Sequence, residues 1–514
     1  METTETEPRL RLLETTRAYA LERLAESGEW EAVAHRHAEY YRNLFERAEG
    51  EAAARPAGEW LADYAPEIDN LRTALDWAFS PGGDASVGVA LTAAAVPLWM
   101  HLSLMDECRA RVEQALAAIK AGADKNARRE MKLHAARAVL LPYIRSDISE
   151  IGVASAKALQ LAEMLGDFEY QLRSLWSQWY FHSANGRYRV ALARAQRFST
   201  IAANQADATD QLTGEILVGV SLHYLGDQPG ARGHIGHALE HAPLQRSQII
   251  RFLVDQRVFA GAYLSRILWL QGFPEQAMRT AERCIDDARA ANHAVSLCNA
   301  LALGACLIAL LVGDLAKAER YIGILLDHSK KSALPVSRAY GRSYDGVLAI
   351  ERGDLDSGLR VLRAGLDDFE EMTPRRYPTR PAFPAQLARA LAGVGRIADG
   401  LAAIDEVLAW TADTEADWFI AELLRVKGEL LLLQGAPEAA ATAEDHFRQA
   451  LDWARRQGAL SWELRAATSL ARLLRDRDRI GEARDLLSSV YGRFTEGFGT
   501  ADLKTAKVLL DDLQ

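Results

Sequence analysis

The chain has 514 residues, of which 49% are hydrophobic and 8% aromatic, and its 60 basic and 70 acidic residues give a net charge of −10. This composition is ample for a folded protein, and four cysteines in such a length exclude a disulfide framework. No basic stripe interrupts the acidic balance, so we expect no direct binding of nucleic acid by this chain.

The first 50 residues carry no repeat and predict a small helical segment. The opening METTETEPRL lacks the character of a signal peptide, and we expect a cytoplasmic protein. A short strand or turn is expected near residues 9–13, followed by two amphipathic helices that break at Ser27-Gly28. Residues 51–85 are expected to form a helical linker that ends with the turn PGGD.

A turn signal recurs about every 40 residues through most of the remaining chain. A small residue follows each turn glycine by five positions, and another precedes it by seven positions except at Trp179. Regular self-similarity at this period indicates a stack of near-identical supersecondary units. The turn glycines are Gly186, Gly226, Gly272, Gly313, Gly353, Gly395 and Gly435, and the frame extends upstream to Ser146 and Ser103 and downstream to Asp478.

The sequence around Gly313 shows what the repeat unit is. Gly313 can take the positive φ that ends a helix, and Asp314 can cap the next helix. Apolar residues then recur at helical spacing from Leu315 to Leu325. The small residues beside each turn lie where the two helices of a hairpin would cross. We therefore predict an all-α solenoid of about ten helical hairpins over residues 86–514. This pattern resembles the tetratricopeptide repeat, and the resemblance implies a right-handed superhelix.

Two stretches within the repeats depart from an average hairpin. Residues 295–313 lack charge throughout, and their length is borderline for a membrane span. Because the stretch is in register as the first helix of a repeat, we expect a buried solenoid helix rather than a membrane helix. Residues 373–384 are rich in proline and basic residues and predict a loop between repeats.

No motif of catalytic or cofactor chemistry is present. The sequence has no nucleophile elbow, zincin helix or dinucleotide loop, so we expect no enzyme, no catalytic residue and no cofactor. His234, His237 and His241 share one helix face, which permits a metal site, but a solvated face is the preferred interpretation and no metal is expected. Three cysteines fall on packing positions, where we expect core fillers rather than nucleophiles: Cys108, Cys284 and Cys306.

The inner face of the superhelix is the expected binding surface, because the first helix of each hairpin lines it. Aromatic and arginine side chains are favoured anchors for partners. The alternative interpretation is that Trp176 and Trp269 belong to the core. Counting back from each turn, the inward-facing set comprises Arg173, Trp176, Tyr180, His223, Arg266, Trp269 and Tyr340.

Both ends of the chain resemble a known family. The spacing of small residues around each turn resembles that of tetratricopeptide repeats, although the period of about 40 departs from the usual 34. RLRLLETTRAYALERLAESGE followed by HRHAEYY resembles the end of the winged-helix segment in bacterial STAND-type predicted ATPases that regulate transcription. EIDNLRTALDWAF is similar to the linker that follows there, and FTEGFGTADLKTAKVLLDDL resembles the terminal repeats.

The resemblance implies a sensor region rather than a nucleotide-binding one. Proteins of that family join an output domain, a P-loop ATPase, a winged helix and a long repeat sensor. The chain contains no G-x-x-x-x-G-K-[ST] motif, so the family's nucleotide site would lie upstream of residue 1. The implied function is to bind a protein, peptide or small effector and so regulate a signalling ATPase and transcription. The alternative is a free-standing adaptor for assembling protein complexes.

Overall fold

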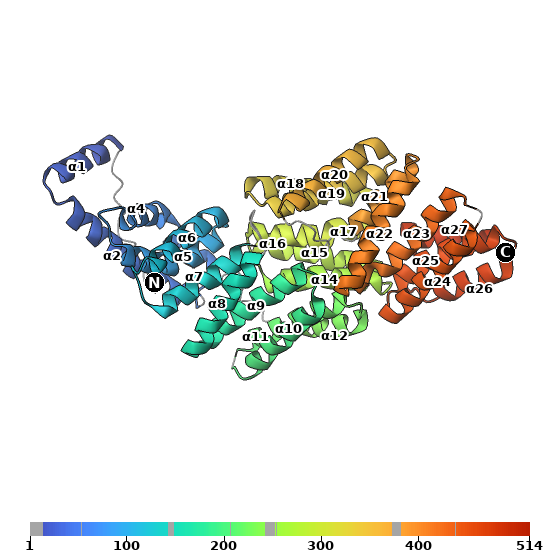
Figure 1. Cartoon of the computed structure of the whole chain (residues 1–514), viewed down its shortest axis with the longest axis horizontal. Coiled ribbons are helices and arrows are strands. Elements are labelled where there is room, and N and C mark those ends of the chain that lie inside the picture. Colours follow the sequence, from blue (N-terminus) through green and yellow to red (C-terminus); the bar gives the residue numbers. More distant parts are fainter. Residues whose placement is uncertain are drawn as a thin grey trace, which may run out of the picture. The chain divides into compact units, whose positions relative to one another are not determined.

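The structure, a computed structural model, describes residues 14–52, 54–141, 149–205, 207–241, 252, 254–372, 382–436 and 438–514. These residues are almost entirely helical and include no strand, which confirms the all-α prediction (Figure 1). The strand or turn expected at residues 9–13 and most of the loop expected at 373–384 lie outside the described residues. The chain divides into two compact units, Met1–Leu98 with Ala110–Leu133, and Trp99–Arg109 with His134–Gln514.

The first unit begins with the helices that the sequence predicts. The expected break at Ser27-Gly28 is confirmed, because α1 ends just before it, α2 begins just after it, and Gly28 has a φ of 71°. α2 packs on α3 and α4, and the Trp60 indole donates a hydrogen bond of 2.9 Å to the Ala48 carbonyl. The domain boundaries at residues 50 and 85 stay predictions. The helices are α1 Glu14–Glu26, α2 Trp30–Ala52, α3 Ala57–Tyr64, η1 Ala65–Glu67, α4 Ile68–Ala78, α5 Ala85–His101, α6 Met105–Lys120 and α7 Ala127–Leu140, the last three having residues in both units.

The second unit is a series of antiparallel helical hairpins. In each hairpin a first helix runs into a turn of the predicted frame and a second helix leaves it. The elements are α8 Ser149–Leu165, α9 Phe168–Ala184, α10 Tyr188–Ala203, α11 Ala208–Tyr224, α12 Gln228–His241, α14 Gln256–Leu270, α15 Pro274–Ala290, α16 Ala294–Asn299, the π-helical η3 Ala300–Ala305, α17 Cys306–Val312, α18 Leu315–Lys331, α19 Pro335–Glu351, α20 Leu355–Met372, α21 Ala382–Gly393, α22 Ile397–Thr414, η4 Asp417–Phe419, α23 Ile420–Gln434, α24 Ala439–Gln457, α25 Leu460–Arg475, α26 Ile480–Tyr491 and α27 Ala501–Asp512.

Every described turn of the predicted frame has left-handed backbone. The seven glycines have φ between 70° and 89°, and Ser103 and Asp478 have φ of 57° and 58° without being glycine. Ser146 lies outside the described residues. At Gly313 the Asp314 carboxylate accepts a hydrogen bond of 3.0 Å from the Lys317 amide, which confirms the expected cap. The turn frame was therefore predicted correctly, including positions where glycine is absent.

The small residues beside each turn lie where the two helices cross. A Cβ added to Gly400 would lie 2.8 Å from the Ala388 carbonyl oxygen, and one added to Gly358 would lie 2.9 Å from that of Gly346. Both pairs stand at the predicted positions, five residues after the turn and seven before it. Since real Cβ atoms do not approach other atoms this closely, the hairpin geometry requires these small residues.

Two alanine substitutions at helix glycines are expected to shift stability in opposite directions. Gly346→Ala would place a Cβ 2.4 Å from the Leu362 amide nitrogen, so it should lower the free energy of unfolding by roughly 1–3 kcal/mol. Gly323 in α18 has no atom within 4 Å of an added Cβ, so Gly323→Ala should raise the free energy of unfolding by roughly 0.5–1 kcal/mol. Urea unfolding of both variants measures this. A loss of stability in both would contradict the assigned crossing.

The uncharged stretch forms one continuous helical segment of the solenoid, α16–η3–α17. Among the described residues, only this helix is long and apolar enough to cross a membrane, and 67% of its most apolar window is buried inside the protein. It packs against α14, α15, α18 and α19. The Tyr344 hydroxyl donates a hydrogen bond of 2.7 Å to the Ala302 carbonyl in the π-helical part. This burial agrees with the interpretation as a first helix of a hairpin.

Hairpins separated by about 200 residues touch within the second unit. The Glu275 amide donates a hydrogen bond of 2.8 Å to the Glu496 carboxylate, and the Arg189 guanidinium donates one of 2.6 Å to Glu415. A Cβ on Gly272 would lie 2.7 Å from Leu460. In Figure 1 the orange helix α22 accordingly lies beside the green helices of this unit. Successive turns of the superhelix are therefore in contact, and part of the inner face is closed.

Candidate functional site

The seven residues predicted for the inner face lie on first helices, and most of them are buried. Trp176, His223, Arg266, Trp269 and Tyr340 are at most 7% exposed, whereas Arg173 and Tyr180 are partly exposed. They do not form one site: Trp176 stacks on Tyr180 with ring centroids 5.9 Å apart, and a second group gathers around Arg266. This burial favours the alternative interpretation, in which the tryptophans stabilise the core.

Arg266 lies in an aromatic enclosure built by two superhelical turns. Its guanidinium carbon is 4.4 Å from the ring centroid of Trp418 and 5.1 Å from that of Tyr263. The His223 ring is 5.1 Å from Trp418 and bonds to the Gln228 side-chain oxygen at 2.8 Å. Burial, together with the neighbouring Arg266, holds the pKa of His223 well below its ordinary value, so the imidazole is neutral. The enclosure is thus a packed interior rather than an open groove.

Trp269 is covered in the same way by the next turn of the superhelix. Its ring centroid is 4.7 Å from that of Trp462, and the two rings are inclined by 73°. The Ser461 hydroxyl donates a hydrogen bond to the Trp269 carbonyl. A partner approaching this part of the inner face would therefore first have to displace α25.

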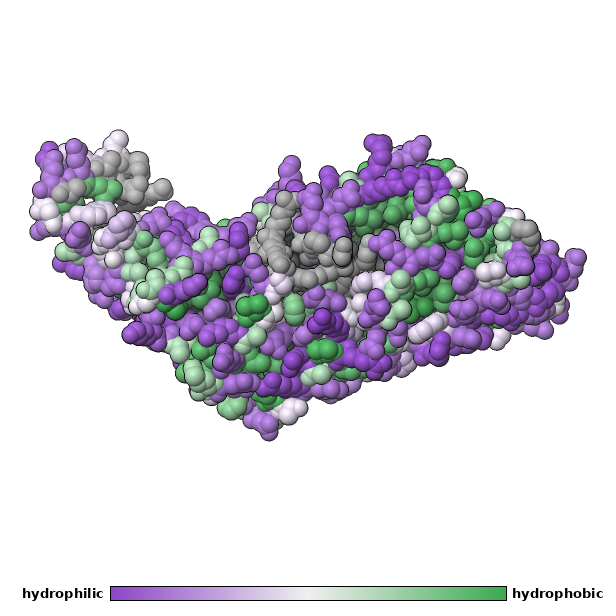
Figure 2. Space-filling model, in the orientation of Figure 1, coloured by the Kyte–Doolittle hydropathy of each residue, from purple (hydrophilic) through white to green (hydrophobic). Residues whose placement is uncertain are grey.

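The inner face opens toward the C-terminus as a cleft of about 330 Å³. First helices α17, α19, α21, α23 and α25 line it together with α27. Partly exposed Leu310 and Leu311 contribute an apolar wall from α17, while charged side chains from α23 and α25 stand among the other lining residues. Figure 2 shows hydrophobic surface over the region of α20 to α23 within an otherwise mainly hydrophilic face. The cleft thus combines apolar surface with polar groups, as binding sites for small ligands and peptides do.

A buried ion network holds the charged side of this cleft. Arg425 donates hydrogen bonds of 2.7 and 2.8 Å to the two carboxylate oxygens of Glu422, and one of 2.5 Å to Glu429. Arg465 donates to Glu422 at 3.1 Å and to Asp502 at 2.8 Å. Burial alone would raise the pKa of Glu422, but Arg425 and Arg465 lower it to about 2. Glu422 is therefore ionised, and its partners are fixed in place.

Two further arginines at the cleft are not locked in this way. Arg389 is 43% exposed and lies 3.3 Å from Glu351, which is itself partly exposed. Arg472 is exposed and has no ion-pair partner among the residues that the structure describes. These guanidinium groups are the ones that can turn toward a bound carboxylate.

Sequence reasoning missed the charged residues of the cleft, although the turn frame contained the signal. The predicted inner-face set stands 3, 6, 10 or 13 residues before a turn and stops at Tyr340. The same offsets before the three later turns give six of the eight charged residues of the cleft, all except Glu351 and Asp502. They are Arg389, Glu422, Arg425, Glu429, Arg465 and Arg472.

The predicted cysteine and histidine groups have ordinary structural surroundings. All four cysteines are buried, and burial raises the pKa of Cys284 and of Cys298 to about 12, so their thiols are unreactive. His234 pairs with Glu215, and the His237 and His241 rings lie 4.4 Å apart. In the described part of the chain, no group of three or more histidine, cysteine or acidic residues is arranged to hold a metal ion.

Comparison with known proteins identifies the architecture. No protein-family model matches the chain, and no curated protein matches it. The solved structure of the APC/C hetero-tetramer Cut9-Hcn1 is similar over 95% of this chain and 88% of that one, with a TM-score of 0.50 and 12% identity. The fold is a tetratricopeptide-like solenoid. Other similar structures include a Rap protein complexed with Competence and Sporulation Factor (77% and 99% coverage, TM-score 0.43, 12% identity) and a tetratricopeptide repeat protein from Parabacteroides merdae (57% and 98% coverage, TM-score 0.32, 16% identity).

Proposed function

We propose that this solenoid is a non-catalytic sensor or scaffold that binds a segment of a partner protein, or a small effector, in the C-terminal cleft. The observation that carries the proposal is the cleft itself, which joins a leucine wall to two exposed arginines. Arg472 has no ion-pair partner among the described residues, and Arg389 pairs only with the partly exposed Glu351. Around Arg266 and Trp269 the inner face is closed by contact between superhelical turns, whereas the cleft leaves room for a ligand.

The chemistry of the cleft favours an extended peptide with a carboxylate. A carboxylate can accept hydrogen bonds from Arg389 or Arg472, and apolar side chains can cover Leu310 and Leu311. The buried network around Glu422 fixes the neighbouring side chains before the ligand arrives, which reduces the entropy lost on binding.

The wider role that we propose is regulation of a signalling ATPase and its transcriptional output in the cytoplasm. This part rests on the resemblance of the two ends of the chain to STAND-type regulators. Mixing the purified chain with a P-loop ATPase domain of such a regulator, followed by analytical ultracentrifugation, tests it. Association supports the sensor role, and a cleft that binds peptides without any association would indicate a free-standing adaptor.

Charge reversal at Arg472 is expected to weaken peptide binding without loss of the fold. Peptides selected from a displayed random library on the full chain would supply the ligand, and fluorescence anisotropy the affinity. Arg472→Glu should reduce affinity at least about tenfold, since an exposed guanidinium facing a carboxylate is replaced by a like charge. Arg320→Glu, the same change on exposed α18 outside the cleft, should leave affinity unchanged. Equal effects of the two variants would remove the cleft from consideration.

A further inference from the structure

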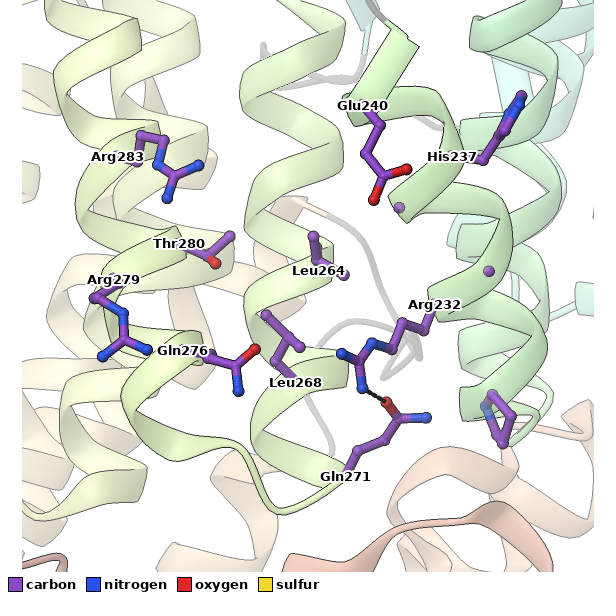
Figure 3. Close-up of a pocket in the computed structure, with 13 residues that line it drawn as sticks. Arg232, His237, Glu240, Leu264, Leu268, Gln271, Gln276, Arg279, Thr280 and Arg283 are labelled. Carbon is purple, nitrogen blue, oxygen red and sulfur yellow. Dashed lines mark hydrogen bonds between the residues drawn. The ribbon is translucent and has the colours of Figure 1, made fainter. Parts of the chain in front are cut away.

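A second groove lies away from the cleft, between two consecutive second helices. Its volume is about 690 Å³, and it is bounded by α12 and α15 with α14 between them (Figure 3). Leu264 on α14 is partly exposed and provides apolar surface in the middle of it, while Leu268, one helical turn further on, is largely buried. No residue lines both this groove and the cleft, so the two are separate sites.

The walls of this groove carry more positive than negative charge. Arg232 projects from α12, Arg279 and Arg283 project from α15, and the carboxylate of Glu240 is the single acidic group among the lining residues (Figure 3). The whole chain has a net charge of −10, whereas the groove has three guanidinium groups and one carboxylate. The groove is therefore positively charged on a protein that is negatively charged as a whole. Such a local excess attracts anionic groups.

The arginines of the groove are weakly compensated by the protein. The partly buried Arg232 donates a hydrogen bond of 3.2 Å to the Gln271 side-chain oxygen and lies 4.8 Å from the Phe273 ring centroid, both uncharged partners. Arg279 lies 3.8 Å from Glu275, and both side chains are more than half exposed. Arg283 has no ion-pair partner within the described parts of the chain. An anion entering the groove would therefore find Arg232 and Arg283 without an internal salt bridge, and Arg279 held only by an exposed ion pair.

Two glycines of α12 leave its backbone uncovered on this side. Gly233 and Gly236 lie inside the helix, where glycine costs roughly 0.5–1 kcal/mol relative to alanine. A Cβ added to either would meet no atom within 4 Å, so internal packing does not require glycine there, unlike at the hairpin crossings. Both line the groove, and the missing side chains let another backbone approach closely.

We propose that this groove binds an acidic segment of a partner protein. Its carboxylates would meet Arg232 from one wall and Arg279 and Arg283 from the other, while an aliphatic side chain covers the partly exposed Leu264. A small inorganic anion would leave Leu264 uncovered. A nucleic acid would need a longer basic stripe and stacking aromatics, and none of the described residues that line the groove is Phe, Tyr or Trp. The site is distinct from the proposed cleft and does not depend on it.

Charge reversal on α15 tests the electrostatic part of this proposal. The probe is a short fluorescent peptide in which Glu and Leu alternate, titrated with the full chain in fluorescence anisotropy. The Arg279→Glu, Arg283→Glu double variant should weaken binding at least about tenfold, and added salt should weaken binding to the unaltered protein. Arg360→Glu with Arg363→Glu, a matched reversal on exposed positions of α20, should leave the affinity unchanged.

A steric block on α12 tests the same groove without removing charge. Gly236→Leu places a side chain in open space, so the fold should be retained while the groove is filled and the acidic peptide loses affinity at least about tenfold. Gly323→Leu, an equally open helix glycine on α18, is the control. Circular dichroism checks the fold of each variant. If both groove variants bind the peptide as the unaltered protein does, the proposal is overturned.

Competition experiments show whether the groove prefers an acidic polypeptide to other anions. The Glu-Leu peptide should not be displaced by inorganic phosphate or by a short oligothymidylate at equal charge concentration, and a Lys-Leu peptide should not bind. Displacement by phosphate or by the oligonucleotide, with the same dependence on Arg279 and Arg283, would overturn the assignment to an acidic polypeptide.

Discussion

Trp269→Ala is expected to lower the free energy of unfolding by roughly 3–5 kcal/mol, because it removes a large side chain that is only 3% exposed. Its ring packs on Trp462, so the cavity would open between two turns of the superhelix rather than within one hairpin. Hydrogen exchange should therefore increase in both α14 and α25, although these helices are far apart in the sequence. Thermal unfolding and hydrogen exchange on the same variant measure the two effects.

Trp30→Ala supplies the control for this prediction. Trp30 is 39% exposed at the start of α2, and its truncation should change stability by no more than about 0.5 kcal/mol. If Trp269→Ala instead kept full stability and lost affinity for a verified partner, Trp269 would be a binding anchor, as the inner-face hypothesis holds. Increased exchange in α14 alone would contradict the contact between superhelical turns.

Arg425→Met is expected to cost roughly 3–5 kcal/mol near neutral pH, because it leaves the buried carboxylate of Glu422 without its main partner. Arg465 still donates a hydrogen bond to Glu422, but it also donates one to Asp502. Urea unfolding of the variant and the unaltered protein gives the difference. Arg472→Met, the same substitution at an exposed position of the same cleft, should be nearly neutral.

The pH dependence gives this prediction a second check. The native pKa of Glu422 is lowered from 4.5 to about 2, so its stabilising contribution is present above pH 4.5 and is lost as the pH falls toward 2. Without Arg425 the native pKa should rise, and Glu422 can then take up a proton in acid. The stability deficit of Arg425→Met should therefore shrink as the pH falls from neutral toward about 4. A deficit independent of pH would show that lost packing, rather than an unpaired charge, is the cause.

The sequence predicts the first series of turns well because each needs left-handed backbone, which glycine adopts without strain. The second series, between one hairpin and the next, was not predicted. It also has positive φ, with glycine at Gly166 and Gly458 but with other residues at Asn292, Ala333 and Glu415. A search for a repeated glycine therefore finds the turns inside the hairpins more readily than the turns between them.

The candidate site was predictable only in part, for a different physical reason. Periodicity shows which residues face inward, and it correctly places Trp269 and Arg266 on first helices. Whether an inward residue is exposed depends on how far the superhelix winds, which is set by many small crossing angles. Here the winding brings Trp462 onto Trp269, a contact that no local pattern encodes. The groove beside Arg232 likewise depends on the gap between two helices, which the sequence alone does not give.

The contact between superhelical turns also has a consequence for synthesis on the ribosome. The Trp269 carbonyl accepts its hydrogen bond from a residue 192 positions later in the chain. At typical translation rates this interval corresponds to roughly 10–40 s, during which the nascent hairpins can form but their inner aromatic surface stays uncovered. The growing chain therefore exposes aromatic surface for a long time and is prone to aggregation during that time. Protection by a chaperone would matter more at this stage than for the finished protein.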